Sequence, residues 1–131
     1  MKKILPALLL TLASGSALAG WSPVQPDNGI FSAYADLNSI KRIGGKASMA
    51  GLYDFRKGDL TPEGKSFFST TVLREYDCEA RKVRLLSHVD FSEPMGVGTA
   101  VSAGARPGRW EKVMRGAVDE VYWKVACGIT R

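Results

Sequence analysis

The sequence predicts an α+β domain in which an antiparallel β-sheet carries one C-terminal α-helix, tied to the sheet by a disulfide. Three observations lead to this prediction. Segments in the middle of the chain alternate between apolar and polar residues, the period of two that is typical of half-buried strands. The last segment changes to the period of an amphipathic helix. Two cysteines lie at the ends of a predicted strand and of that helix.

Residues 1–19 have the pattern of a cleavable signal peptide. Two lysines precede a short apolar run, and an Ala-Leu-Ala cleavage site stands at positions 17–19. The run is too short to span a bilayer, and Gly20 stands where a lipoprotein would have its cysteine. We therefore expect no membrane anchor, and a periplasmic or secreted domain of residues 20–131.

The charge of the mature domain excludes one class of partner. Loss of the two signal-peptide lysines lowers the formal net charge from +5 to +3. So small and dispersed a positive charge does not predict nucleic-acid binding.

The first elements after the cleavage site are short. Residues 21–29 contain Pro23, Pro26 and Gly29 and are predicted to be an irregular arm. Residues 30–36 and 40–43 suit two strands separated by a turn at 36–39. Gly44-Gly45 is a hairpin turn pair that leads into the next strand.

Three longer strands are predicted in the middle of the chain. Residues 46–55 alternate, 66–78 are rich in Phe, Thr and Val, and 82–91 alternate most clearly, with a polar loop at 56–65. Residues 92–108 are rich in Gly and Pro and are predicted to be a mobile loop or a weak edge strand. The shared face of the first strand carries Ala47, Met49, Gly51, Tyr53 and Phe55. In the third, Val83, Leu85, Ser87, Val89 and Phe91 share a face.

The predicted helix covers residues 117–127. Acidic side chains in its first turn complement the helix dipole, and Gly128 is suited to end it. Its apolar stripe is formed by Val118, Val121, Tyr122 and Val125.

The cysteine count predicts a single disulfide between Cys78 and Cys127. An exported domain with two cysteines has only one possible pairing, which closes a loop of about 50 residues. Metal ligation and a catalytic thiol are the alternatives. One histidine in the whole chain makes a poor ligand set, so no metal is expected.

Candidate catalytic groups do not converge in the sequence. Ser87 and His88 point to opposite faces of a strand, so with Asp90 they do not form a triad. Glu75 and Asp77 share a face, but solvation or pairing with arginine accounts for them. We therefore predict that the protein is not an enzyme, and a periplasmic hydrolase is the weakest of three hypotheses.

Large side chains and arginines favour a binding surface for a protein partner. The predicted surface consists of Arg81, Arg84, Trp110 and Trp123. The alternative is a periplasmic binder of a small hydrophobic ligand or haem, for which His88, Tyr76 or Tyr34 would have to lie beside an apolar cleft. No motif supports haem ligation, so no cofactor is expected.

Several short blocks, taken together, resemble a known family. In chain order they are Asp36-Leu37-Asn38-Ser39-Ile40, Tyr53-Asp54-Phe55, Glu75-Tyr76-Asp77-Cys78, Arg81, Arg84, Trp110-Glu111 and a Trp-containing helix that ends in Cys127. This order is similar to that of the surface-adhesin protein E family of Gram-negative bacteria and covers nearly the whole mature chain. The Glu-Tyr-Asp-Cys block with its distal helical cysteine is the most specific part.

The resemblance implies a small exported module with an antiparallel sheet and a disulfide-tied helix. It also implies adhesin-like binding, since the best-known members are surface lipoproteins that bind host matrix and plasma proteins, some with haem binding. The sequence departs from the family in lacking the lipidated cysteine. It also has Ala50 where relatives often have tryptophan, and Arg115-Gly116-Ala117 in place of a Pro-Gly-Ser helix start.

Overall fold

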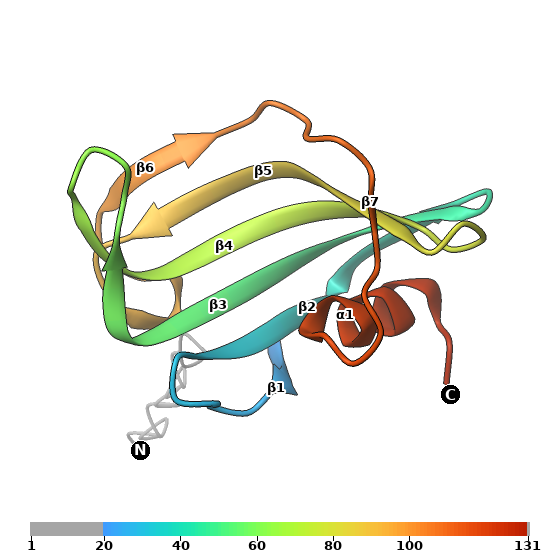
Figure 1. Cartoon of the computed structure of the whole chain (residues 1–131), viewed down its shortest axis with the longest axis horizontal. Helices are drawn as coiled ribbons and strands as arrows, with labels where there is room; N and C mark the ends of the chain where they lie inside the picture. Colours follow the sequence, from blue (N-terminus) through green and yellow to red (C-terminus); the bar gives the residue numbers. More distant parts are fainter. Residues whose placement is uncertain (1–19, 131) are drawn as a thin grey trace, which may run out of the picture.

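The computed structural model describes residues 20–130, so the predicted signal peptide lies outside the described residues. The chain forms one antiparallel sheet in which neighbours in sequence are neighbours in space, in the order β1-β2-β3-β4-β5-β6, and β7 also pairs with β5 (Figure 1). The strands are β1 (Trp21–Gln25), β2 (Phe31–Ile43), β3 (Lys46–Leu60), β4 (Ser66–Asp77), β5 (Lys82–Phe91), β6 (Ala100–Gly104) and β7 (Glu111–Lys112). A 3₁₀ turn, η1 (Pro94–Gly96), precedes β6, and one helix, α1 (Val118–Cys127), follows β7. The predicted α+β fold is confirmed.

The helix packs on the sheet because small residues on β2 and β3 make room for its aromatic side chains. Ala33, Ala35 and Ala47 are almost completely buried beneath it. The buried helix residues are Tyr122, Trp123 and Ala126. The Tyr122 hydroxyl donates a hydrogen bond of 2.7 Å to the carbonyl of Tyr34 in β2. A buried phenol is thus satisfied by the sheet backbone itself.

The Tyr122 side chain of the helix packs directly against the backbone of the sheet at Gly51. A Cβ at this position would lie 3.1 Å from Cε1 of Tyr122 and 3.2 Å from Cγ2 of Val72. We expect Gly51→Ala to lower the free energy of unfolding by about 1–3 kcal/mol, because overpacking a filled core forces its neighbours to move. Urea denaturation checks this, and an unchanged midpoint would mean that the helix is not seated on β3 as described.

The helix boundaries are confirmed, but the predicted stripe is rotated. Val121 is 38 % exposed, whereas Trp123, which lies off the predicted stripe, is 4 % exposed. The helix ends at Gly128, which takes the left-handed conformation (φ 70°) and donates its N–H to the last turn.

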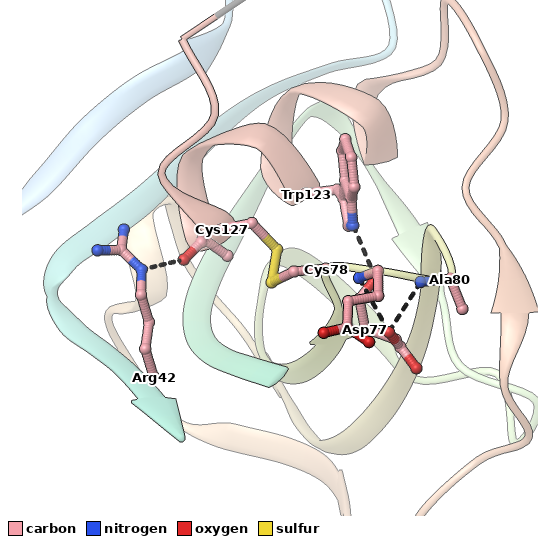
Figure 2. Close-up of a disulfide and its surroundings, with 8 residues drawn as sticks. Arg42, Asp77, Cys78, Ala80, Trp123 and Cys127 are labelled. Atoms are coloured by element: carbon pink, nitrogen blue, oxygen red, sulfur yellow. Dashed lines mark hydrogen bonds between the residues drawn. A yellow bond between two sulfur atoms is a disulfide. The ribbon is translucent and has the colours of Figure 1, made fainter. Parts of the chain in front are cut away.

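The disulfide between Cys78 and Cys127 is present and joins the turn after β4 to the end of α1 (Figure 2). The two Cα atoms are 5.7 Å apart. Beside it, Nε of Arg42 donates a 2.9 Å hydrogen bond to the carbonyl of Ala126, and Nε1 of Trp123 donates one of 2.9 Å to the carbonyl of Asp77. The end of the helix is therefore held by one covalent bond and two hydrogen bonds.

Three predictions at the N-terminal side of the sheet are wrong. Residues 21–25 form β1 and not an irregular arm; Pro23 is tolerated because β1 is an edge strand whose register shifts there. The predicted turn at 36–39 is an irregularity within a continuous β2, where Asp36 and Ser39 bond to nearby backbone groups. Part of the predicted loop at 56–65 extends β3 to Leu60.

The alternation predicted for β5 is also wrong, because a bulge interrupts it. Arg74 of β4 lies opposite Leu85, whereas Leu73 lies opposite Ser87, so Leu86 is an extra residue. A bulge moves the residues beyond it to the other face. Val83 and Asp90 are accordingly the buried residues of this strand.

Candidate functional site

The helix covers only part of its face of the sheet, and an apolar depression lies beside its first turn. We call this depression the aromatic trough. It opens widely to solvent, and its volume is about 380 Å³. Its walls are almost entirely apolar, with residues from β2, β3, β4 and the start of α1. The lining residues are Phe31, Tyr53, Phe55, Thr70, Val72, Arg74 and Val118.

The aromatic rings of the trough pack against one another. The ring centres of Phe31 and Tyr53 are 5.4 Å apart in an edge-to-face arrangement, and Tyr53 stacks on Phe55 at 6.5 Å. Phe55 in turn meets Phe67 edge to face at 5.7 Å. Because each ring is braced by a neighbour, the trough presents a preformed apolar surface that loses little side-chain entropy on contact.

Arg74 supplies the one charge in the wall of the trough. Its guanidinium donates a hydrogen bond to the hydroxyl of Tyr53, lies 3.4 Å from Oδ1 of Asp119, and packs over the rings of Tyr53 and Tyr122. The side chain is 21 % exposed, so part of it faces solvent. The site thus combines an aromatic floor with a cation held in place by tyrosines.

A second concavity, of about 270 Å³, adjoins the first, because Arg74 also lines it. Its other charged residues include Arg109, Glu111 and Asp119, from the segment before β7, from β7 and from α1. Charges of both signs line it, so it is not a dedicated anion site. It gives the trough a polar end.

Burial in this cluster shifts the pKa of three tyrosine side chains. Burial raises the pKa of Tyr53, Tyr76 and Tyr122 above the ordinary value, since an ionised phenol would lose its solvation there. In the unfolded chain these phenols ionise near pH 10. The folded state then binds more protons than the unfolded state, so stability falls as pH rises.

We therefore expect full stability below about pH 10 and a progressive loss above it. Urea midpoints measured from pH 8 to 11.5 check this, with Tyr53→Phe as the comparison, since it removes one of the three phenols and should flatten the slope. A midpoint that stayed constant up to pH 11.5 would contradict the buried placement of the three rings.

Two of the four residues of the predicted interaction surface come together on the helix side. The Arg81 guanidinium lies over the Trp123 ring at 4.6 Å and pairs with Glu120 at 2.8 Å. Arg81 is half-buried, but Trp123 is too deeply buried to contact a partner. The prediction of Trp123 as a contact residue is corrected by its position in the core.

The other two residues come together elsewhere. The Arg84 guanidinium lies over Trp110 at 4.8 Å and donates a 2.7 Å hydrogen bond to Glu75. Each of these residues has a neighbour on its own strand, Tyr76 or Val83, that belongs to the core under the helix. Successive side chains of a strand point to opposite faces, so Glu75 and Arg84 face the other side of the sheet. The four predicted residues thus form two arginine–tryptophan pairs, and their use as an interaction surface stays a prediction.

His88 and Asp90, two of the candidate catalytic groups, lie near each other on β5. Nε2 of His88 is 3.9 Å from Oδ2 of Asp90, and Oδ1 of Asp90 accepts a 2.7 Å hydrogen bond from Thr70. Tyr76, a candidate haem ligand, is 1 % exposed. Within residues 20–130 no three His, Cys, Asp or Glu side chains cluster closely enough to hold a metal ion.

The trough itself could not be recognised from sequence patterns. The alternation of residues 46–55 places Tyr53 and Phe55 on the correct face of one strand, but Phe31, Val72 and Arg74 come from other strands, and for Arg74 the sequence predicts only ion pairing. The available signal was the two-residue period of any strand at 66–78, which places Thr70, Val72 and Arg74 on one face.

Comparison with known proteins places this fold in a family. The model of the surface-adhesin protein E family matches residues 21–128. Two crystal structures of Haemophilus influenzae protein E share the fold. Crystal form II is 16 % identical with a TM-score of 0.59, over 73 % of this chain and 80 % of that one. The protein from a non-typeable strain is 14 % identical with a TM-score of 0.61, over 84 % of this chain and 76 % of that one.

Two further findings complete this result. A search of curated sequences found no significant match. No helix among residues 20–130 has the length and apolar character needed to cross a membrane. The family match covers nearly all of the described residues, and the resemblance noted in the sequence is confirmed: the chain belongs to the surface-adhesin protein E family.

Proposed function

We propose that this protein is an exported, non-enzymatic binding module that uses the aromatic trough to hold apolar side chains of a protein partner. The observation that carries the proposal is the trough itself: ring-braced, nearly free of polar atoms and left uncovered by the helix. An aromatic patch beside an arginine is the composition that dominates binding energy in protein interfaces.

The open shape of the trough favours a protein over a small hydrophobic ligand or haem. Small-molecule sites enclose most of their ligand's surface. A ligand in this trough would leave one side in water, whereas a side chain that projects from a partner is covered by its own protein. The small-ligand hypothesis remains the second candidate, supported by the same apolar lining.

The remaining parts of the proposal rest on sequence and family. Export to the periplasm or beyond rests on the signal-peptide pattern of residues 1–19. A non-enzymatic role is supported by the family and by the scattered placement of the lone histidine and the carboxylates. General acid–base catalysis requires such groups to converge on one point.

Binding to purified host matrix and plasma proteins, measured by surface plasmon resonance, tests the proposal. We expect saturable binding of residues 20–131 to at least one of them, weakened about tenfold or more by Phe55→Ser, a loss of roughly 1.4 kcal/mol. Leu60→Ser is the matched control, because Leu60 lies on the same strand, is 63 % exposed and does not line the trough.

Circular dichroism first establishes that both variants are folded. Equal weakening by Phe55→Ser and Leu60→Ser, or no effect of Phe55→Ser on a bound partner, would contradict the use of the trough. Stoichiometric binding of haem or a fatty acid, lost in Phe55→Ser, with no binding of any protein tested, would favour the second candidate.

A further inference from the structure

The two outer edges of the sheet differ in how they are protected. An edge strand exposes unpaired backbone N–H and C=O groups, and proteins usually block it with proline, charge, bulges or a covering element. At one edge, β1 contains Pro23, its register shifts between Pro23 and Gln25, and α1 packs against it. This edge is blocked in three ways.

The opposite edge, beyond β5, is blocked only along part of its length. Near the disulfide the edge is β7, whose two residues Glu111 and Lys112 are both charged and exposed. Next comes Gly108, whose N–H donates a 2.7 Å hydrogen bond to the carbonyl of Leu85, flanked by Pro107 and Arg109. The rest of this edge is β6, which pairs with residues of β5 from His88 to Phe91.

β6 is protected by a bulge at Val101 but by neither charge nor proline. Its five residues, Ala-Val-Ser-Ala-Gly, include no charge and no proline. Its irregularity falls at Val101, and Ser102, Ala103 and Gly104 pair in regular register with β5. Within the described residues β6 has only β5 as a neighbour, so its outer row of backbone groups faces solvent (Figure 1). Small side chains leave that row accessible.

Charge beside β6 indicates what fits there. Arg106 and Arg109 follow β6 directly, both are exposed, and neither belongs to an ion pair within residues 20–130. A strand laid along β6 and continued in the same line would pass these two guanidinium groups. Acidic side chains on it would form charge-assisted hydrogen bonds with them.

We propose that β6 takes up an extended acidic segment of a partner protein as an additional antiparallel or parallel strand of the sheet. Backbone hydrogen bonds to β6 supply the affinity, and Arg106 and Arg109 supply the selection for acidic sequences. No residue of β6 lines the aromatic trough, although Arg109 also lines the concavity that adjoins it, so this surface extends the proposed function and does not depend on it.

A second copy of the chain is the competing occupant and fits less well. Two copies joined through β6 would bring together five small residues from each side. Five residues a side is far fewer than the roughly 20–30 residues a side of a standard interface. Such a pairing would also make no use of the two arginines as attractive groups.

The test uses residues 20–131 labelled with ¹⁵N and a nine-residue peptide that alternates valine with glutamate and threonine. We expect the peptide to shift the amide signals of β6 and to slow hydrogen exchange of its outward N–H groups, with β1 unaffected. A matched peptide with lysine in place of glutamate should bind at least tenfold more weakly. Equal affinity for the two peptides, or shifts confined to residues of the aromatic trough, would overturn the proposal.

Variants separate backbone pairing from loss of fold. Along β6 the backbone N–H groups point alternately toward β5 and toward solvent. Of the two variants Ser102→Pro and Ala103→Pro, one therefore removes a solvent-facing donor and the other removes a hydrogen bond to β5. The outward variant should keep the wild-type melting temperature and lose peptide binding. Tight binding by that variant would overturn the proposal.

Two more outcomes complete the test. Arg106→Glu with Arg109→Glu should reverse the preference between the two peptides, while Phe55→Ser should leave peptide binding unchanged even if it abolishes binding at the trough. Amide shifts in β6 that depend on protein concentration without peptide would identify a second copy as the occupant and overturn the proposal.

Discussion

Replacing Cys78 and Cys127 together with alanine lowers the free energy of unfolding by about 4 kcal/mol. The bridge joins residues 49 positions apart, and on the chain-entropy model a crosslink of this span removes that much entropy from the unfolded chain. The effect is large for a domain of this size, whose total stability is on the order of 5–15 kcal/mol.

Urea denaturation of the wild-type protein and the double variant measures this effect. The hydrogen bonds of Arg42 and Trp123 remain in the variant, so we expect a folded protein with a lowered midpoint and not an unfolded chain. Arg42→Met is the companion variant, because it removes one noncovalent tie and leaves the bridge intact. An unchanged midpoint in the double variant would show that packing alone holds the helix on the sheet.

Trp123→Ala has an effect of similar size, about 3–5 kcal/mol, because it empties a filled core position. The indole is 4 % exposed, its Nε1 donates to the carbonyl of Asp77, and its face supports the guanidinium of Arg81. The variant loses the buried indole, its hydrogen bond and its contact with Arg81 together. Thermal and urea unfolding both measure the loss.

Trp110→Ala is the matched control, since it removes a tryptophan that also packs against an arginine but is only half-buried. We expect it to cost less than half as much as Trp123→Ala, because less of its surface leaves water on folding. Equal stability losses in the two variants would contradict the different placements of the two rings. A fully stable Trp123→Ala protein would restore Trp123 as a surface residue.

Local patterns were sufficient to predict that the central strands exist and where the helix begins and ends. In β3 the alternation placed Ala47 and Met49 on the face under the helix, and Tyr53 and Phe55 on the same face beyond it. The boundaries of α1 followed from its period and from Gly128. The disulfide followed from the cysteine count. Each of these features depends on the order of neighbouring residues.

Features that depend on pairing between strands could not be predicted from local pattern. The bulge at Leu86 exists because β5 has one residue more than β4 between two paired segments, and nothing within β5 indicates it. β1 was missed because Pro23 normally ends a strand, and only its place at the edge of the sheet makes it tolerable.

The candidate site could be predicted only in part, for the same reason. The trough joins Phe31, Phe55 and Val72 from three strands with Val118 from the helix, and sequence alone does not say which of these meet. Trp123 was placed one step off the helical stripe. The structure buries it against the turn after β4, where its Nε1 donates to the carbonyl of Asp77 and its ring packs under the guanidinium of Arg81.

Cross-saturation NMR on the complex tests the central claim, that the uncovered aromatic face is the binding surface, most directly. Perdeuterated, ¹⁵N-labelled domain is bound to the unlabelled partner identified by the affinity measurements, and the partner's aliphatic protons are irradiated. We predict signal loss at residues 53–55 of β3, 70–74 of β4 and the first turn of α1, which surround the trough. Signal loss confined to the opposite face, around Glu75, Arg84 and Trp110, would contradict the account.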